Sequence, residues 1–254
     1  MLLAIDAGNT NIVVGIFDGA ELKKQWRFRT EKNLRVDELH TRMSGFFNEL
    51  GISFSEIKKT VIASVVPSIN PAINSFCYKY LACSTLWVDA ASASRLTVLY
   101  KDAAIGADRI VNAVAAFHKY KTDLIVIDFG TATTFDAVSG TGEYLGGAIS
   151  PGIKIAAEAL FLNTSKLPRV DLADPPEKVI GYDTVSSMKS GTIYGYGCLV
   201  DGMIQLIGNE MNQKPLVIAT GGLSTLMRDV CKTIKTVEPD LTLEGLYIMG
   251  KEPV

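Results

Sequence analysis

The first thirty residues consist of apolar runs separated by short polar breaks. The run Leu2–Ala7 predicts a buried strand, and Ile12–Phe17 predicts a second one. Asp18-Gly19 is typical of a tight hairpin turn, so Glu21–Phe28 is expected to return as a third strand. The chain is therefore predicted to open with three strands joined by short turns.

Helical spacing replaces this pattern further along the first half. Val36–Leu50 places charged and apolar residues at helical intervals, and Gly51 is expected to end that helix. The other elements predicted in this half are strands at Thr60–Val66 and Thr85–Val88 and a helix at Ile69–Leu81.

The second half begins in the same way, with three predicted strands followed by helices and a further strand. The predicted strands are Leu124–Asp128, Thr133–Val138, Tyr144–Ile149 and Leu216–Ala219. Pro151 suits the first position of a helix, where its missing N–H is not needed. The predicted helices are Pro151–Leu162, Ser186–Asn212 (in one piece or in two, because of its glycines) and a final helix opened by Gly221-Gly222.

The two halves therefore share one plan. Asp6-Ala-Gly-Asn-Thr10 and Asp128-Phe-Gly-Thr131 stand at equivalent places, each after the first strand of its half. This layout predicts an α/β protein with an internal duplication, although a chance match of two hairpins is the alternative. Pro168–Pro176 is interpreted as a surface loop rather than a domain linker.

Composition and charge exclude several classes of protein. The chain has 254 residues, a net charge of -2 and an isoelectric point near 5.8, so a basic groove for nucleic acid is not expected. Its four cysteines form no CxxC pair and it has two histidines, so a zinc site is not expected. Signal-peptide features and apolar runs of about 18 residues are also missing. These observations predict a soluble cytoplasmic protein with reduced cysteines and no membrane partner.

The first motif, Asp6-Ala-Gly-Asn-Thr10, sets a carboxylate near the end of a buried strand, with a glycine two residues later. Gly8 can adopt positive φ and lets backbone N–H groups approach a phosphate closely. Thr10 and Asn11 can add side-chain donors, and Asp6 can then hold Mg²⁺ through water. The alternative is an ordinary Asp/Gly hairpin.

The second motif, Asp128-Phe-Gly-Thr131, repeats this logic. Thr131 offers hydroxyl and N–H donors to a polyphosphate, and a second acidic strand end facing the first would clamp a phosphate chain. A functional role is the preferred interpretation for Asp128 and Thr131. For Thr133 and Thr134, simple β-propensity is the better explanation.

A third motif, Gly106-Ala-Asp108-Arg109, lies where a helix begins. Asp108 can be a surface N-cap, or it can accept the proton of an attacking hydroxyl in phosphoryl transfer. Arg109 could bind an anionic group, which a cap does not need. The residues alone leave both interpretations open.

Two glycine-rich junctions between strand and helix complete the set. Ala219–Ser224 suits the close approach of a nucleotide base and ribose, but a tight strand–helix turn explains it equally well. Gly146–Gly152 is a second junction of this kind, expected near the substrate.

Together and in this order, the motifs resemble the type III pantothenate kinases, a branch of the superfamily of acetate and sugar kinases, Hsp70 and actin. The Gly-x-Asp-Arg and Asp-x-Gly-Thr-Ala elements are the most specific, and the compact length also fits. The matching segments are Asp6–Asn11, Ala63–Pro67, Tyr100, Gly106–Arg109, Asp128–Thr134, Gly146–Gly152, Thr184 with Ser190-Gly191, Ala219–Gly222 and Leu243–Gly245.

The resemblance implies two actin-like (ribonuclease H-like) lobes, expected here as residues 1–118 and 119–254, with the nucleotide in the cleft. It implies phosphorylation of pantothenate by ATP to 4'-phosphopantothenate, the first step of coenzyme A biosynthesis. The implied cofactors are Mg²⁺ and a monovalent cation, K⁺ or NH₄⁺. The implied assembly is a homodimer with the active site at its interface.

The resemblance also implies roles for single residues. Asp108 matches the catalytic base, and Asp128 matches a ligand of the monovalent cation. Pantothenate positions are matched by Tyr100, Gly106, Ala107, Asp108, Arg109 and, across the dimer interface, Thr184. ATP positions are matched by Asp6, Ala7, Gly8, Asn9, Thr10, Asn11, Ile12, Val13 and Thr131, with Asp6 also facing Mg²⁺.

Two positions near the substrate depart from the family pattern. Asp102-Ala103 stands where Asn-Pro is common, and Asp183 stands where Asn is common. Two other functions remain as alternatives: a kinase or phosphohydrolase of another small substrate, and a nucleotide-binding regulatory protein. The presence of Asp108 and Arg109 argues against the regulatory protein.

Overall fold

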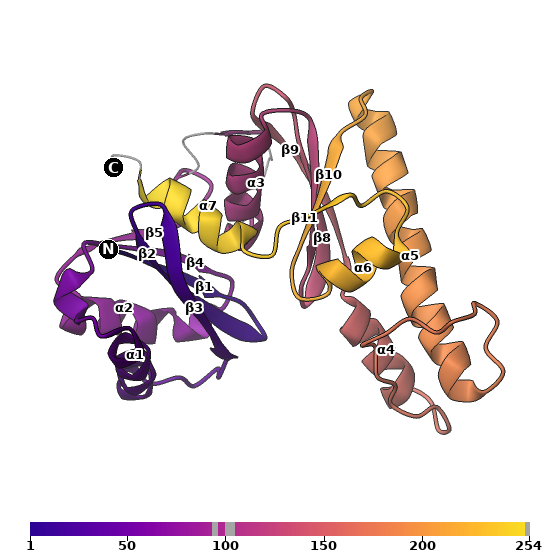
Figure 1. The fold of residues 1–254 in the computed structure, drawn as a ribbon, viewed down its shortest axis with the longest axis horizontal. Coiled ribbons are helices and arrows are strands. Elements are labelled where there is room, and N and C mark those ends of the chain that lie inside the picture. Colours follow the sequence, from indigo (N-terminus) through magenta and orange to yellow (C-terminus); the bar gives the residue numbers. More distant parts are fainter. Residues whose placement is uncertain (93–95, 100–104, 252–254) are drawn as a thin grey trace. The chain divides into compact units, whose positions relative to one another are not determined.

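The computed structural model describes residues 1–92, 96–99 and 105–251, and the chain divides into two compact units (Figure 1). The first unit contains Met1–Ala115 together with the chain from Leu241 onward, and the second contains Ala116–Asp240. The predicted lobes, 1–118 and 119–254, remain a prediction. The division into units differs from them chiefly in assigning the chain from Leu241 to the first unit.

The first unit is built on a five-stranded sheet with strand order β3-β2-β1-β4-β5. The three N-terminal strands form the predicted antiparallel hairpins, and β1 also pairs in parallel with β4, so β1 lies at the buried centre. The strands are β1 (Leu2–Ala7), β2 (Asn11–Asp18), β3 (Glu21–Arg29), β4 (Lys59–Ser64) and β5 (Ser84–Trp87).

Helices cover both faces of this sheet. On one face α1 and α2 pack on a core that includes Leu3, Ile5 and Phe76, and on the other face α7 packs against β1 and β4 (Figure 1). The elements are α1 (Val36–Leu50), α2 (Asn70–Tyr80), α7 (Leu241–Gly250) and two short 3₁₀ turns (Phe54–Glu56 and Pro67–Ile69). The short strand β6 (Thr97–Val98) is not part of this five-stranded sheet. The sequence did not predict α7.

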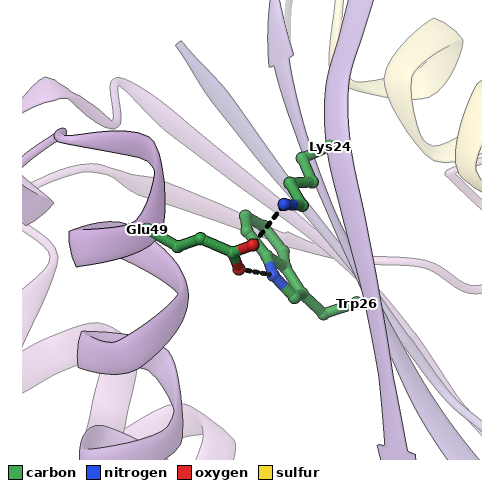
Figure 2. Close-up of polar contacts among 3 residues, drawn as sticks. All are labelled: Lys24, Trp26 and Glu49. Carbon is green, nitrogen blue, oxygen red and sulfur yellow. Dashed lines mark hydrogen bonds and ion pairs between the residues drawn. The ribbon is translucent and has the colours of Figure 1, made fainter.

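The edge strand β3 is held on α1 by aromatic and polar contacts. Trp26 stacks on Phe46 with ring centroids 4.8 Å apart. Figure 2 shows Glu49 of α1 accepting a hydrogen bond from Trp26 Nε1 at 2.6 Å while also pairing with Lys24. The Lys24 ammonium and then the Trp26 N–H hold the pKa of Glu49 below its ordinary value. These contacts fasten β3 to α1.

The second unit repeats the strand plan and covers one face of its sheet with helices α4, α5 and α6 (Figure 1). Helix α5 is one continuous element, so its glycines do not divide it. A helix, α6, does follow Gly221-Gly222 as predicted. It is not the final helix, because α7 comes after it. The elements are β7 (Leu124–Phe129), β8 (Ala132–Val138), β9 (Glu143–Pro151), α4 (Ile153–Leu162), α5 (Thr184–Met211), β10 (Leu216–Thr220), α6 (Ser224–Val230) and β11 (Thr236–Val237). Helix α3 (Ala107–Tyr120) contains the boundary between the units.

Matching strand orders confirm the predicted duplication. In the second unit the strands lie in the order β9-β8-β7-β10-β11, which corresponds strand by strand to β3-β2-β1-β4-β5. The central strands β1 and β7 also share one burial pattern, in which only the fifth residue is partly exposed. That residue is Asp6 in β1 and Asp128 in β7. Within the residues described, no helix combines the length and apolar character needed to cross a membrane.

Candidate active site

The first polar turn of the site connects β1 to β2. Asp6 occupies the next-to-last position of β1, and Gly8 N donates to Asn11 O at 3.0 Å to close the turn. Gly8 does not adopt the positive φ that the sequence allowed. Its small size matters instead, because a Cβ there would lie 3.2 Å from Asn11 O. The backbone of the turn is therefore compact directly after β1, the strand that carries Asp6 near its end.

Asp108 lies in the first turn of α3 rather than at its cap, since the helix begins at Ala107. Its Oδ1 accepts a hydrogen bond from Arg109 N at 2.8 Å. Burial raises the pKa of Asp108 despite this bond and the nearby Arg109 charge, which both lower it. A partly buried carboxyl group with a raised pKa is a candidate for proton transfer.

Gly106 allows the Asp108 carboxylate to fold back over the backbone. A Cβ at Gly106 would lie 2.6 Å from Asp108 Oδ1 and 3.7 Å from Val65 Cγ1. Val65 follows β4 and donates its N–H to Ala7 O at 3.1 Å. Asp108 therefore lies near the carboxyl ends of the parallel strands β1 and β4, where open α/β sheets bind their ligands. Asp6 lies at the same edge of the sheet.

Asp128 marks the corresponding edge in the second unit. It pairs with Thr220 on β10 and with Thr134 on β8, so the three side chains share one row of the sheet. Gly221 has φ +87, and a Cβ there would overlap Oδ1 of Asp128. Only glycine fits this contact without displacing the carboxylate.

Thr134 lies beside Asp128 on the neighbouring strand and contributes a hydroxyl there. From the sequence, the preferred explanation for this threonine was β-propensity alone. Its hydroxyl donates to Asp136 Oδ2 at 3.1 Å, and Tyr144 donates to Asp136 Oδ1 at 2.6 Å. Having donated its one hydrogen, the Thr134 oxygen can only accept a hydrogen bond or bind a cation. Thr133, by contrast, is fully buried in β8, as expected of a core residue.

The Thr131 turn is held against the glycine-rich junction before α4. Gly152 N donates to Thr131 O at 3.2 Å, and Gly130 N donates to Ala132 O at 3.1 Å. A Cβ at Gly152 would overlap Thr131 O and lie 2.8 Å from Gly130 O. Thr131 itself is exposed. The backbone at Thr131 and Gly152 thus packs closely while the Thr131 side chain stays accessible.

A cavity of about 420 Å³ opens in the second unit next to the Gly221-Gly222 junction. Leu223, which follows that junction, forms one wall, and Lys154, Ala157 and Glu158 of α4 form another. Arg169 closes it and pairs with Glu158, with Nη2 and Oε1 2.5 Å apart. Of these residues only Leu223 belongs to a motif found in the sequence, the Ala219–Ser224 junction. Their place beside the glycine junction makes the cavity a candidate for a nucleoside.

Thr184 is exposed at the start of α5 and lines a separate open cavity of about 610 Å³ in the second unit. Asp183 is the N-cap of α5, and its Oδ1 accepts from Ser186 N at 2.8 Å. That bond also lowers the pKa of Asp183. Asp and Asn cap helices equally well, so this departure from the family pattern preserves the local structure.

The sequence-predicted residues thus fall into sets within each unit. The first unit holds Asp6–Val13 and Gly106–Arg109, with Arg109 only 6% exposed. The second holds Asp128, Thr131 and Thr184. Tyr100 and Asp102-Ala103 lie outside the described residues, so their prediction stays untested. Throughout the described ranges, no three His, Cys, Asp or Glu side chains group as metal ligands.

Comparison with protein families identifies close relatives. A family model described as type III pantothenate kinase matches residues 2–206. A type III pantothenate kinase of Desulforapulum autotrophicum is 54% identical over 256 residues, covering 100% of this chain and 98% of that protein. One from Desulfosudis oleivorans is 53% identical over 251 residues, covering 98% of each chain.

Solved structures of distant proteins share the fold. The inorganic polyphosphate/ATP-glucomannokinase of Arthrobacter sp. strain KM aligns with a TM-score of 0.51 at 15% identity, over 97% of this chain and 96% of that one. The ethanolamine utilization protein EutJ of Carboxydothermus hydrogenoformans aligns with a TM-score of 0.59 at 12% identity, over 98% and 89%. At such low identity these likenesses concern the fold alone, and they agree with the two-lobed α/β class predicted above.

Proposed function

The chain belongs to the type III pantothenate kinase family, and we propose that it transfers the γ-phosphoryl group of ATP to the primary hydroxyl of pantothenate. The observation that carries this proposal is full-length similarity to kinases of that name, together with the partly buried Asp108 near the ends of β1 and β4. The product is 4'-phosphopantothenate, which starts coenzyme A biosynthesis.

Asp108 acts as the general base in this proposal. A base must be ionised and must reach the hydroxyl proton of the acceptor. The raised pKa of Asp108 makes its carboxylate a stronger proton acceptor than an ordinary aspartate. Arg109, Gly106, Ala107 and Tyr100 contact pantothenate, and the guanidinium of Arg109 suits the pantothenate carboxylate.

ATP phosphates bind at the turn Asp6–Val13 and at Thr131. Compact turns with closely packed glycines present backbone N–H groups to anions, as Gly8 and Gly152 allow here. The nucleoside enters the cavity beside Gly221-Gly222, between Leu223 and α4. Its lining residues are charged rather than aromatic on the α4 side, which suits the hydroxyls of a ribose.

Two cations complete the proposed site. Asp6 offers oxygen ligands to Mg²⁺, which proteins hold by one or two carboxylates together with substrate phosphates and water. Asp128 and the Thr134 oxygen form an oxygen donor pair, which suits a weakly hydrated monovalent cation such as K⁺ or NH₄⁺. When bound, these ions neutralise charge on the transferring phosphoryl group.

We also propose a homodimer in which Thr184 serves the partner's site. On α5, Cβ atoms added at Gly191, Gly195 and Gly202 would meet nothing within 4 Å inside the chain, so this face lies open. Leu199 and Leu206 on the same helix are 39% and 60% exposed. An open helix face of glycine and leucine supports close packing against a second copy.

A phosphorylation assay tests the reaction. Purified protein, ATP, Mg²⁺ and pantothenate are combined in KCl or in NaCl at matched ionic strength, and 4'-phosphopantothenate is measured by mass spectrometry. Hydroxylated acids and sugars replace pantothenate as controls. Product with pantothenate alone supports the proposal. Phosphorylation of another acceptor would indicate a kinase with a different substrate. Nucleotide binding without any turnover would indicate a regulatory protein.

A further inference from the structure

The end of strand β3 is bonded to the turn that follows β1. Thr30, the residue after β3, donates its hydroxyl hydrogen to Gly8 O at 2.6 Å. Its backbone N–H donates to Thr10 O at 3.0 Å. One residue thus holds two carbonyl groups of the turn Asp6–Thr10, and its side chain is partly buried there.

These two bonds fix the orientation of the turn's peptide groups. In a trans peptide the C=O and the following N–H point in opposite directions. With Gly8 O directed at the Thr30 hydroxyl, the N–H of Asn9 points away from Thr30. With Thr10 O directed at Thr30 N, the N–H of Asn11 points away from β3 toward the β1 side of β2, where Gly8 lies. A turn that binds an anion must direct N–H groups toward it, and the bond from Thr30 to Gly8 O sets the direction of the Asn9 N–H.

Thr30 directly follows a strand that is paired with β2 and packed on α1. Arg29, its neighbour in β3, pairs with Asn11 at the start of β2. Farther back, β3 is fastened to α1 by the Trp26–Phe46 stack and by Glu49 (Figure 2). The hydroxyl of Thr30 therefore approaches Gly8 from the end of a paired strand.

We infer that Thr30 is a positioning residue for phosphate binding, whose hydroxyl orients the Gly8-Asn9 peptide so that its N–H faces the ATP phosphates. The inference rests on the proposed role of the turn Asp6–Val13 in binding ATP. Thr30 acts through that turn and contacts no reacting atom. Its loss should weaken nucleotide binding and leave the pantothenate site unchanged.

Thr30→Val removes the hydroxyl and keeps the β-branched shape, and Thr30→Ser keeps the hydroxyl. Thr41→Val is the matched control, because Thr41 also donates its hydroxyl to a backbone carbonyl, that of Asp37 at 2.9 Å, but within helix α1. Isothermal titration with Mg·ADP measures nucleotide affinity without turnover. Thermal melting of all three variants reports whether each is folded.

We expect Thr30→Val to weaken Mg·ADP binding by about tenfold, the usual effect of one lost hydrogen bond that orients a binding group. Thr30→Ser and Thr41→Val should bind within about twofold of the parent. In the kinase assay, the KM for ATP should rise in Thr30→Val while that for pantothenate stays constant.

Equal Mg·ADP affinity in Thr30→Val and the parent would overturn the inference, as would an equal loss in Thr41→Val or no recovery in Thr30→Ser. Should Thr30→Val not fold, the comparison of Thr30→Ala with Thr30→Ser decides in the same way. Failure of pantothenate phosphorylation in the parent would refute the proposed function but leave the titration with Mg·ADP as a valid test of Thr30.

Discussion

Gly221 and Asp128 are packed so closely that a Cβ atom at position 221 would overlap Oδ1 of Asp128. The same Cβ would lie 2.7 Å from the backbone nitrogen of Phe129, and φ at Gly221 is +87. The glycine-rich junction before α6 therefore shapes the position of the carboxylate in β7 as well as the turn itself.

Gly221→Ala should lower both stability and activity. A non-glycine residue at this φ costs about 1–3 kcal/mol, and the clash forces the Asp128 carboxylate to move. We expect a lower melting temperature and a loss of the response to potassium. Gly222→Ala is the control, because a Cβ there meets nothing within 4 Å. Equal effects of the two substitutions would refute a specific contact between Gly221 and Asp128.

Asp108→Asn keeps the size of the side chain and its hydrogen bond from Arg109 N but removes the proton acceptor. The turnover number should fall by roughly 10²–10⁴, the usual contribution of a positioned general base. Circular dichroism should show an unchanged fold. Steady-state kinetics with saturating ATP and pantothenate measure the effect, and near-parental turnover would refute the assignment of the base.

The raised pKa of Asp108 predicts how stability and activity depend on pH. Because burial favours the neutral form, the folded protein binds more protons than the unfolded chain between the ordinary and the raised pKa of this group. Its contribution to stability is therefore favourable below the ordinary pKa and is lost as pH rises through that window. Asp108→Asn should lack this loss, so the variant should be relatively more stable at neutral pH.

Activity should change with pH in the opposite direction, because it requires the ionised form of Asp108. A base works only when ionised, so kcat/KM for pantothenate should fall as pH drops through the raised pKa of Asp108. The midpoint should lie above the ordinary aspartate value near 3.9. Rates measured in constant ionic strength buffers, with denaturant melts at each pH, test both dependences. A midpoint at the ordinary aspartate pKa would contradict this description of Asp108.

Asp128→Asn tests the monovalent cation. If Asp128 and Thr134 bind K⁺ or NH₄⁺, the parent should be faster in either salt than in NaCl at matched ionic strength. Asp128→Asn should lose activity and also most of that selectivity. Melting temperature in the three salts gives a second measurement independent of turnover. Equal rates and equal melting of the parent in all three salts would assign Asp128 to Mg²⁺ or to the structure of the turn.

The proposed dimer predicts how active a dimer of two different variants should be. If Thr184 serves the partner's site, Asp108→Asn and Thr184→Val homodimers are both impaired, but a heterodimer of the two has one intact site. Random exchange of equal amounts should restore about a quarter of parental activity, because half of the dimers are mixed and each has one of two sites. No recovery after exchange would place Thr184 outside the partner's site.

Leu199→Glu tests whether the open face of α5 forms the proposed dimer interface. Leu199 lies on the open face of α5, and a buried charge there should dissociate the dimer. Tyr78→Glu is the control, since Tyr78 is 89% exposed on α2 of the first unit. Light scattering should give a monomer for the first variant alone. A fully active monomer of the parent at assay concentration would rule out the assembly.

Local sequence determined much of the fold. Apolar runs bounded by turn residues were sufficient to predict β1, β2 and β7, because buried central strands have few alternative interpretations. The paired motifs around Asp6 and Asp128 also revealed the duplication, since both residues follow the same buried pattern. Residue chemistry and spacing identified Asp108 as a candidate, although they could not decide between a cap and a base.

Only the tertiary structure decided the rest. Helix α7 is mostly apolar, with Thr242 and Glu244 as its polar residues, so no clear helical periodicity marked it. Its place became evident from packing, because a Cβ at Gly250 would lie 2.8 Å from Val61 of β4. The partial burial of Asp108, which raises its pKa, depends on the first turn of α3 lying near the ends of β1 and β4. The bond from Thr30 to Gly8 joins residues 22 positions apart, and a hydrogen bond over this separation leaves no mark in local sequence spacing. Contacts at this range arise when strands pair, and strand pairing is a property of the folded chain.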